Sequence, residues 1–481
     1  MNLLAAFQQR VAAHPDRVAL IDPKARAWTY EALDRRGQAL AAQFRRKGLR
    51  RGDRVLLALG VDADLYAALA ALWRLGAVAV LPEPALGLAG IRRALELTQP
   101  RAALLDGIYR VLPWIVPQLR RLDLQLRLRA GEDLDDACVD LPAEAPALIS
   151  FTTGSTGAPK AIVRSHGFMR AQDAAVAPLI GTGGALEIDL VGFPVFVVAN
   201  LGQGITSVLP DWPARRLDKA SPARIARLIE RHGVTRLLLN PELVSRIADH
   251  GIPASVSTVF TGGGPVFPDL LRKVRGCRPD LSFVAVYGST EAEPIAEIAA
   301  QHISPADYLA MAEGKGLLAG PPVKGAQVRI VDDEIQVSGN HVVQGYLDPS
   351  RDSESKVRGP DGTLWHRTGD AGYFDGLGRL WLLGRVGGRV GHIWPFAVEA
   401  AARSWPGVRR AALAGAADAP VLAIEGKREE FNQWRGRAQA LGIASVVWLR
   451  AIPMDKRHGS KVDTASLATL IARPVGHMPA T

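Results

Sequence analysis

Strand-like and helix-like segments alternate along most of this chain, and this alternation constrains its fold more than any other feature. One unit has a strand over 54–59, a helix over 63–75 and a second strand over 77–81. Farther along, a helix over 222–231, preceded by a serine and opened by a proline, is followed by a strand over 235–240. A strand, a helix and a strand in this order form a right-handed crossover between parallel strands. The pattern therefore predicts an α/β protein with parallel sheets.

With 481 residues the chain is too long for one compact core, so we expect more than one domain. The clearest candidate boundary is the glycine pair Gly387 and Gly388, which follows a strand-like segment over 380–383. Adjacent glycines leave the backbone free to rotate, as a hinge requires, although an ordinary glycine turn has the same sequence. We predict a large N-terminal domain over 1–385 and a small, mobile C-terminal domain over 386–481.

The composition is that of an ordinary globular protein, with 48% hydrophobic and 22% charged residues. Its two cysteines, Cys138 and Cys277, lie far apart without metal-ligand neighbours, which argues against a disulfide framework and a zinc site. A reducing cytoplasm fits best, and the first residues lack the pattern of a signal peptide. Charged residues interrupt the most apolar region, 55–80, so we expect no membrane span.

The formal net charge of +10 raises the question of a nucleic-acid or anionic-lipid partner. The arginines are nevertheless scattered through the predicted helices, often beside Asp or Glu, and only short clusters such as 45–47 and 120–121 stand out. Solvated helix faces explain this pattern better than nucleic-acid binding, which we do not expect. It stays an open alternative that the basic residues form a surface that attracts nucleotides or an acidic carrier protein.

A loop rich in hydroxyl groups and glycines follows the apolar, strand-like run over 147–151. Its residues are Thr152, Thr153, Gly154, Ser155, Thr156, Gly157, Ala158, Pro159 and Lys160. Glycines let backbone N–H groups approach an anion, the hydroxyls donate hydrogen bonds, and the lysine adds a positive charge. The spacing differs from that of a Walker loop. A phosphate-binding loop and a polar surface turn are both compatible with these residues.

Two further strand-like runs end in segments that suit a nucleotide. The run over 259–261 is followed by Gly262, Gly263, Gly264 and Pro265, a turn whose backbone can press against a flat purine. Such strand-end turns are also common without any ligand.

The second run, over 284–286, leads into Tyr287, Gly288, Ser289, Thr290 and Glu291. The tyrosine ring can stack on a base, the threonine hydroxyl can reach a phosphate, and the glutamate offers an oxygen ligand to Mg²⁺.

In this order, these segments resemble motifs of the adenylate-forming (ANL, AMP-binding) superfamily, which includes acyl-CoA synthetases, luciferases and nonribosomal adenylation domains. A Thr-Gly-Asp turn at Asp370, the later Arg385 and the segment of Lys461 resemble its remaining motifs. The resemblance implies a large N-terminal lobe of parallel-sheet αβα subdomains plus a small β-barrel-like subdomain, and a small mobile α+β C-terminal domain. It also implies ATP and Mg²⁺ as cofactors, and a small-molecule carboxylic acid that is converted to an acyl-AMP with release of pyrophosphate.

The resemblance assigns roles to individual residues. Glu291 would be the metal ligand, and it would act with Thr290 and Lys461 in catalysis. Lys461 would offset charge as the carboxylate attacks the α-phosphate, whereas a lone lysine near a C-terminus is usually solvated. The implied ATP-binding residues are Thr152, Thr153, Gly154, Ser155, Thr156, Gly157, Lys160, Gly262, Gly263, Gly264, Pro265, Tyr287, Gly288, Asp370 and Arg385.

Several short segments of the sequence resemble the corresponding segments of the β-lactone synthetases of bacterial olefin biosynthesis. Such enzymes adenylate a β-hydroxy acid, whose own hydroxyl then closes a four-membered lactone and releases AMP. The segment after the predicted hinge, 389–395, is also shorter than the thiol-delivery loop of typical CoA ligases. The segments that carry this resemblance are 193–196, 201–204, 365–370, 378–381 and 453–458.

An acyl-CoA synthetase or acyl-carrier-protein ligase, which would use CoA or phosphopantetheine, remains the alternative. Ser289 and Glu293 depart from the olefin-pathway pattern beside the acyl site, which favours a shorter or more polar acid. Phe193, Phe196, Gln203 and Ser289 are the candidate acyl-pocket residues, although core packing explains such positions equally well. A degenerate nucleotide-binding regulator is disfavoured because the charged motif residues are intact.

Overall fold

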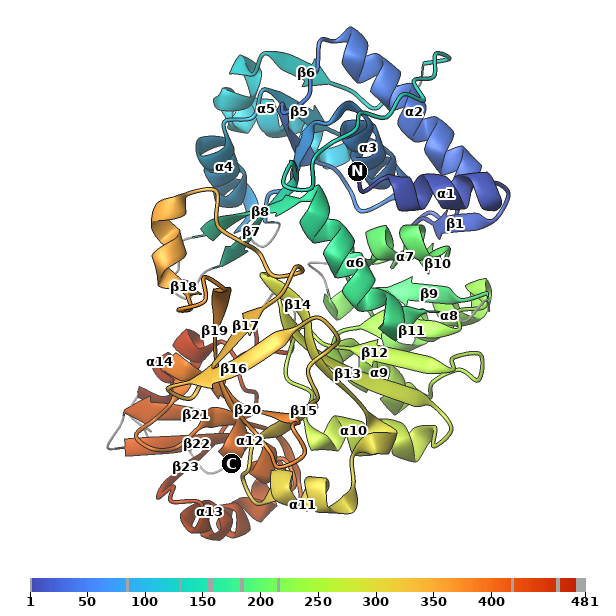
Figure 1. The fold of residues 1–481 in the computed structure, drawn as a ribbon. Helices are drawn as coiled ribbons and strands as arrows, with labels where there is room; N and C mark the ends of the chain where they lie inside the picture. The colour runs from blue at the N-terminus through green and yellow to red at the C-terminus, as the bar shows by residue number, and fades with distance from the viewer. Residues whose placement is uncertain are drawn as a thin grey trace.

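The computed structural model describes residues 2–83, 86–129, 131–153, 159–181, 186–213, 217–416, 419–455 and 459–472. Figure 1 shows two large sheets one above the other, a third sheet to the left of the lower one, and the C-terminal elements at the bottom. This mixed α/β architecture confirms the predicted fold class.

The first sheet belongs to the N-terminal part of the chain and has the strand order β6-β5-β3-β4-β7-β8. Neighbouring strands are parallel except for β7 and β8, which form an antiparallel hairpin. In β3, Val55 and Leu57 pack with the core of α2 and α3, while Leu56 and Ala58 pack with the core of α4, because successive side chains alternate across a sheet. The elements are β3 (Arg54–Ala58), β4 (Val78–Val80), β5 (Ala102–Leu105), β6 (Leu124–Leu126), β7 (Pro146–Thr153), β8 (Pro159–Ser165), α2 (Tyr30–Arg46), α3 (Ala63–Leu75), α4 (Gly87–Thr98) and α5 (Leu112–Ile115).

The second sheet has the order β14-β13-β12-β11-β9-β10-β1-β2 and is parallel except at its two ends. Leu237 and Leu239 of β11 pack with the core of α8, α9 and α10, whereas Leu238 packs with α6 and α7. Its elements are β1 (Val18–Ile21), β2 (Ala27–Thr29), β9 (Ile188–Val191), β10 (Thr206–Val208), β11 (Arg236–Leu239), β12 (Thr258–Thr261), β13 (Ser282–Ser289), β14 (Ala292–Ala299), α1 (Ala5–Ala13), α6 (His166–Ile180), α7 (Phe196–Gln203), α8 (Pro222–His232), α9 (Pro241–His250) and α10 (Pro268–Cys277).

The third sheet is antiparallel, with the order β15-β20-β19-β17-β16 and β18 paired to β19. Its elements are β15 (Leu317–Gly320), β16 (Gln327–Val331), β17 (Glu334–Ser338), β18 (Lys356–Arg358), β19 (Leu364–Phe374), β20 (Leu380–Arg385) and the nearby α11 (Pro305–Ala312).

This sheet takes the place of the predicted β-barrel-like subdomain, and it is open rather than closed. Within the described residues its end strands, β15 and β16, do not pair with each other. The segment after β15 instead pairs with the second sheet, where the Glu297 N–H donates to the Pro321 carbonyl at 3.3 Å and Ala296 bridges Pro322. The second sheet therefore occupies the edge that a closed barrel would use.

The C-terminal elements form a small α+β unit with its own core. Strand β21 pairs antiparallel with β22, and β22 pairs parallel with β23. Val398, Leu422 and Trp434 are buried in one cluster of this unit. The boundary after residue 385 and the mobility of this unit stay predictions. The elements are α12 (Pro395–Ala402), β21 (Val408–Ala416), β22 (Ala419–Gly426), α13 (Phe431–Ala440), β23 (Ser445–Trp448) and α14 (Thr464–Ala472).

The predicted helix boundaries follow from local capping. The Asp62 side chain accepts a hydrogen bond from the Asp64 N–H at 3.1 Å at the start of α3, and Gly76 ends the helix with φ of +69°. At the start of α8 the Ser221 hydroxyl accepts from the Arg224 N–H at 3.3 Å. Strands β3 and β4, which α3 connects, are parallel, as the predicted crossover requires.

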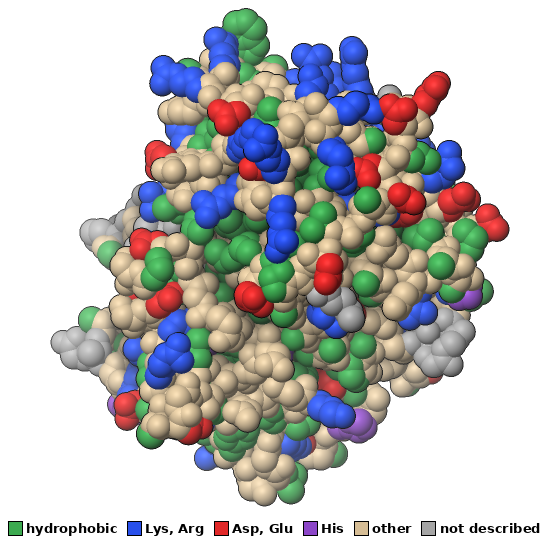
Figure 2. All heavy atoms as spheres, turned by 45° about the horizontal axis from the view of Figure 1, so that its top comes forward, with side chains coloured by type: hydrophobic (Ala, Val, Ile, Leu, Met, Phe, Trp, Pro, Cys, Tyr) green, Lys and Arg blue, Asp and Glu red, His purple; other side chains and the backbone are tan. Residues whose placement is uncertain are grey.

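The surface carries many basic side chains, interleaved with acidic ones. Figure 2 shows Lys and Arg side chains over the upper part of this face, with Asp and Glu between them. Several arginines are paired, such as Arg45 with Asp135 at 2.6 Å. Among the helices that the structure describes, none combines the length and the apolarity needed to cross a bilayer.

Candidate active site

Four adjacent parallel strands of the second sheet, β9, β11, β12 and β13, end at the same edge. Phe193 follows β9, Gly262 follows β12, and Thr290 follows β13. Since the carboxyl ends of parallel strands form a crevice in open α/β sheets, three of the predicted segments meet here.

The predicted phosphate loop joins β7 to β8 of the first sheet. Thr152 pairs with Lys160 and Thr153 with Pro159 across the hairpin. Gly154, Ser155, Thr156 and Gly157 lie outside the described residues.

The described end of this loop carries a buried lysine side chain, that of Lys160. The Lys160 ammonium lies 2.8 Å from the Glu354 carboxylate and 4.9 Å from the centre of the Tyr346 ring. Lys160 is thus fixed at the exit of the loop, beside the phosphate site that its sequence predicts.

Tyr346 and Lys356 lie beside Lys160 and Glu354, and neither was predicted from the sequence as a site residue. The Tyr346 hydroxyl donates to Glu291 at 3.3 Å and shares a hydrogen bond with Ser355 at 2.9 Å. Lys356 is buried with its ammonium 6.0 Å from the Tyr346 ring, and it donates to the Val343 carbonyl. Burial lowers the pKa of Lys356 to about 8, although Glu291 opposes the shift. Neither residue lies in a glycine-rich motif, so only the fold brings them to the site.

The glycine turn after β12 is packed so closely that side chains would not fit. A Cβ on Gly262 would lie 2.5 Å from the Val286 carbonyl oxygen, and one on Gly264 would collide with the Ser460 hydroxyl. Gly263 has φ of +72° and faces the Phe193 ring, which would lie 3.2 Å from a Cβ there. Such bare backbone is compatible with the predicted adenine contact. Pro265 follows in the irregular segment before α10.

Tyr287, Asp370 and Arg385 come together from three strands. The Tyr287 hydroxyl donates to the Asp370 carboxylate at 2.9 Å, and the Arg385 guanidinium lies 3.4 Å from the same carboxylate. Asp370 of β19 and Arg385 of β20 are cross-strand partners. Burial raises the pKa of Asp370, and Arg385 opposes this shift. A carboxylate beside an exposed guanidinium offers both an acceptor and donors to a diol.

The segment after Tyr287 is tied to the hairpin of the phosphate loop. Arg164 of β8 is buried, and its guanidinium donates to the Thr290 carbonyl at 2.9 Å and to the Ser150 hydroxyl at 2.7 Å. Gly288 leaves room for the chain that returns in β14, because a Cβ there would lie 3.2 Å from the Glu293 Cα. The fold therefore holds Thr290 and Glu291 at a fixed position beside the loop.

Lys461 reaches the site from the C-terminal unit. The backbone N–H of Lys461 donates to the Asp455 carboxylate at 3.2 Å, and the backbone carbonyl of Lys461 accepts from the Asp455 N–H at 2.8 Å. The ammonium interacts electrostatically with Asp370 and Glu293. Together with the contact of Ser460 at Gly264, this brings Lys461 close to the glycine turn and to Asp370, and its catalytic role stays a prediction.

The predicted hinge residues lie in a short turn over 386–388, directly after β20. A Cβ on Gly387 would contact nothing within 4 Å, whereas one on Gly388 would lie 3.3 Å from Pro395. The open surroundings of Gly387 are compatible with rotation, and the hinge stays a prediction.

A narrow apolar cavity lies between the two large sheets, close to the glycine turn. The Phe193 ring, which faces Gly263, makes an edge contact with Phe196 at 6.0 Å between ring centres. Phe196 in turn lines the cavity, which helices α1, α3, α6 and α7 enclose. Its apolar lining includes Leu4, Phe7, Leu69, Trp73, Val176 and Phe196.

The other predicted acyl residues have different surroundings. The Gln203 amide donates to the Asp173 carboxylate at 3.0 Å, and Asp173 lines the cavity. The Ser289 hydroxyl is buried and has no hydrogen-bond partner among the described residues. Burial raises the pKa of the half-buried Glu293 to about 7, although Arg164 opposes the shift. The cavity is thus lined mainly by apolar side chains, whereas the polar Glu293 lies near Lys461, and the acyl pocket stays a prediction.

Comparisons with known proteins agree with this geometry. The chain is 31% identical to an olefin beta-lactone synthetase of Stenotrophomonas maltophilia, over 97% of both chains. It is 28% identical to a 2-succinylbenzoate–CoA ligase of Bacillus velezensis, over 85% of this chain and 84% of the relative. The fold is similar to a solved O-succinylbenzoate coenzyme A synthetase from Bacillus subtilis in complex with ATP and magnesium ion, with a TM-score of 0.78 and 22% identity over 96% of this chain and 98% of that one. The sequence profile of the AMP-binding enzymes matches residues 7–347, and the chain belongs to this family, as its motifs predicted.

Proposed function

We propose that this enzyme activates a β-hydroxy acid with ATP and then closes the acyl adenylate to a β-lactone. The observation that carries the proposal is the 31% identity with an olefin beta-lactone synthetase along almost the whole of both chains. The short segment after the hinge supports it. Val390 and Ile393 exchange two backbone hydrogen bonds of 3.0 Å in a tight turn, immediately before α12 begins at Pro395. A turn of this size leaves little chain to guide an incoming thiol.

In the first step a carboxylate oxygen of the acid attacks the α-phosphorus of ATP, and the bond to pyrophosphate breaks. Lys461 would neutralise charge between the carboxylate and the α-phosphate. Lys160 would hold the outer phosphates, while Asp370 and Arg385 would bind the ribose. The glycine turn after β12 would hold adenine beside Tyr287.

The residues present fit a magnesium ion that is shared with the substrate. Glu291 is partly exposed and, among the described residues, accepts a hydrogen bond from Tyr346 at 3.3 Å, which leaves oxygen lone pairs for a hard cation. No group of three or more His, Cys, Asp or Glu side chains that could hold a metal occurs in the described ranges. One carboxylate together with substrate phosphates is a usual environment for Mg²⁺, which when bound neutralises phosphate charge.

In the second step the β-hydroxyl oxygen attacks the carbonyl carbon of the acyl adenylate. A carbon–oxygen bond closes the four-membered ring, the carbon–oxygen bond to AMP breaks, and AMP leaves with the electron pair. The hydroxyl proton passes to water. This step needs no external nucleophile, so only the small acid and ATP are consumed.

The second candidate is transfer of the acyl group to the thiol of CoA or of an acyl carrier protein. The 28% identity with a 2-succinylbenzoate–CoA ligase favours this candidate. In both cases we place the enzyme in the cytoplasm, which its two free cysteines, Cys138 and Cys277, support.

The two candidates are separated by incubating the enzyme with ATP, Mg²⁺ and a panel of acids, with and without CoA or a phosphopantetheinyl carrier. For lactone closure we expect AMP release and a product that weighs one water less than the β-hydroxy acid, without thiol. Strict dependence of AMP release on a thiol would rule out the lactone proposal and support the second candidate. An unreactive 3-deoxy acid of equal length, which should stop at the acyl adenylate, is the matched control.

A further inference from the structure

A short helical segment between β5 and β6 exposes a cluster of large apolar side chains. It consists of the 3₁₀ turn Gly107–Val111 and α5. Ile108 is 80% exposed, Val111 53%, Trp114 78% and Ile115 46%. Their spacing of three and four residues places them along one side of consecutive helical turns.

The opposite side of the same segment is anchored in the core. Leu112, Val116 and Leu119 are buried in the cluster that covers one face of the first sheet. These anchors prevent the segment from turning its exposed side chains inward. The exposed apolar surface is therefore a fixed feature of the fold.

Arginines border this apolar surface. The Arg120 guanidinium lies 4.2 Å from the centre of the Trp114 ring, and Arg121 follows it in the chain. Neither of these two forms an ion pair with any residue that the structure describes, whereas Arg110 pairs with Asp106 at 2.6 Å. Residues 106–129 contain five arginines and two aspartates, so the region has an excess of positive charge.

We propose that this surface, formed by Ile108, Val111, Trp114, Ile115, Arg120 and Arg121, docks the enzyme onto an anionic phospholipid membrane. The aliphatic side chains enter the boundary between headgroups and acyl chains, where a tryptophan ring also prefers to lie. The two arginines meet the lipid phosphates. A fluid headgroup layer accepts such protruding side chains without a matching cavity, which a folded protein partner would have to supply. This inference is independent of the reaction proposed above.

The position of the segment is compatible with catalysis at the membrane. In Figure 1, α5 lies at the end of the molecule opposite to α13 of the C-terminal unit. A membrane bound at α5 therefore leaves the C-terminal unit and Lys461 unobstructed.

The test is sedimentation of the full-length enzyme with vesicles of equal parts phosphatidylcholine and phosphatidylglycerol, compared with phosphatidylcholine alone. We expect binding to the anionic vesicles that weakens as salt is added. Combined replacement of Ile108→Ser and Trp114→Ser should reduce the bound fraction at least about tenfold, because two apolar anchors are lost. Combined replacement of Arg120→Gln and Arg121→Gln should reduce both the binding and its salt dependence.

Leu377→Ser is the matched control, because Leu377 is 77% exposed but lies between β19 and β20, outside this surface. It should bind vesicles like the unaltered enzyme. All variants should release pyrophosphate at the normal rate from a short, water-soluble acid, which shows that they fold. Absence of binding to anionic vesicles, or equal binding by the Ile108→Ser, Trp114→Ser variant, would overturn the proposal. Loss of self-association in that variant, measured by light scattering without any vesicle binding, would overturn it too and identify a contact between copies of the chain.

Discussion

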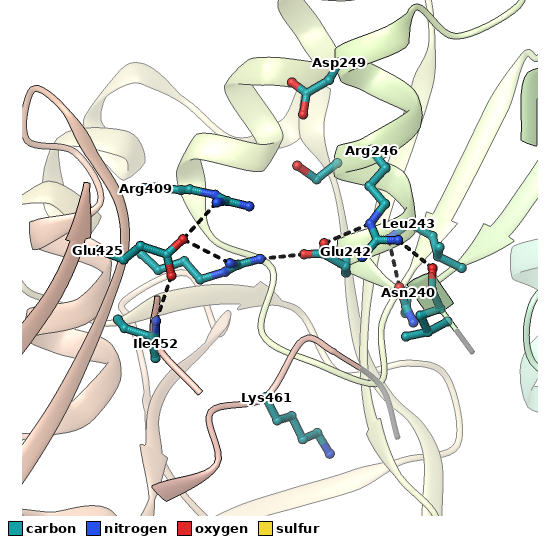
Figure 3. Close-up of polar contacts among 12 residues, drawn as sticks. Asn240, Glu242, Leu243, Arg246, Asp249, Arg409, Glu425, Ile452 and Lys461 are labelled. Carbon is teal, nitrogen blue, oxygen red and sulfur yellow. Dashed lines mark hydrogen bonds and ion pairs between the residues drawn. The ribbon is translucent and has the colours of Figure 1, made fainter. Parts of the chain in front are cut away.

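The Arg410 guanidinium of β21 donates a hydrogen bond to the Glu242 carboxylate at 2.9 Å, and so joins the C-terminal unit to α9, which packs on the second sheet. On the other side Arg410 lies 3.3 Å from Glu425 of β22, which also pairs with Arg409 at 3.0 Å. In Figure 3 the side chain of Lys461 extends away from these ion pairs. The network thus holds the C-terminal unit in the arrangement that brings Lys461 toward the predicted nucleotide site, and the ion pairs themselves lie outside that site.

Arg410→Gln should slow the adenylation step by weakening this arrangement. The pair is partly buried, with both side chains 18% exposed, so we expect a loss of about 1 kcal/mol and a roughly fivefold lower rate of pyrophosphate release. Arg409→Gln is the matched control, since Arg409 pairs with Glu425 but is not joined to Glu242. In a double-mutant cycle, Glu242→Gln should add little to Arg410→Gln. Equal rates in the Arg409 and Arg410 variants would contradict the proposed role of the contact.

Lys461→Ala should remove nearly all adenylation activity while ATP binding survives. The ammonium offsets charge that develops at the α-phosphate, so its removal should lower the rate about 10²- to 10³-fold. The rate is measured by pyrophosphate release and the binding by equilibrium dialysis. Lys427→Ala, an exposed lysine of the same unit, should leave both unchanged. Unaltered adenylate formation in the Lys461 variant would show that the assignment is wrong.

Replacement of both Gly387 and Gly388 by proline should impair turnover. Proline fixes φ and stiffens the turn, so steady-state rates should fall several-fold while a single round of adenylation is retained. Gly387→Ala is the control, because an added Cβ there meets nothing within 4 Å. A proline variant with normal steady-state rates would remove the hinge from the mechanism.

Ala199→Phe should shorten the preferred acid. Ala199 lines the apolar cavity between the two sheets, and a larger ring there would fill the space open to an aliphatic tail. We expect kcat/KM to fall about tenfold or more for a long-chain β-hydroxy acid. The value for a short acid, measured in the same assay, serves as the internal control and should not change. A parallel loss for both acids would mean that the substitution disturbs the fold rather than the pocket.

His166 should make the protein less stable at mildly acidic pH. It is fully buried, its Nδ1 accepts the Leu3 N–H at 3.1 Å, and burial lowers its pKa to about 4. Between pH 6.5 and 4 the unfolded chain binds a proton at this histidine and the folded chain does not, so stability falls as the pH is lowered. The full effect is about 3 kcal/mol. Urea unfolding across this range should show a correspondingly weaker pH dependence for His166→Gln than for the unaltered protein, and an identical dependence would refute the prediction.

The local sequence was sufficient to predict the ends of helices that are capped by residues next to them in the chain. Asp62 and Gly76 bound α3, and Ser221 begins α8, because a cap requires only a neighbouring backbone group. The antiparallel partners β8 and β14 were not predicted. Their pairing depends on the strand beside them rather than on their own pattern.

The sequence by itself determined the family and its charged motif residues, since Lys160, Glu291, Asp370, Arg385 and Lys461 lie in short segments of recognisable order. Only the tertiary structure decided what surrounds them. Tyr346 lies beside Glu291 and Lys160, although the chain separates it from them by 55 and 186 residues, and Arg410 meets Glu242 across 168 residues. Such contacts form when whole sheets pack against each other, and no local pattern of side chains encodes how two sheets meet.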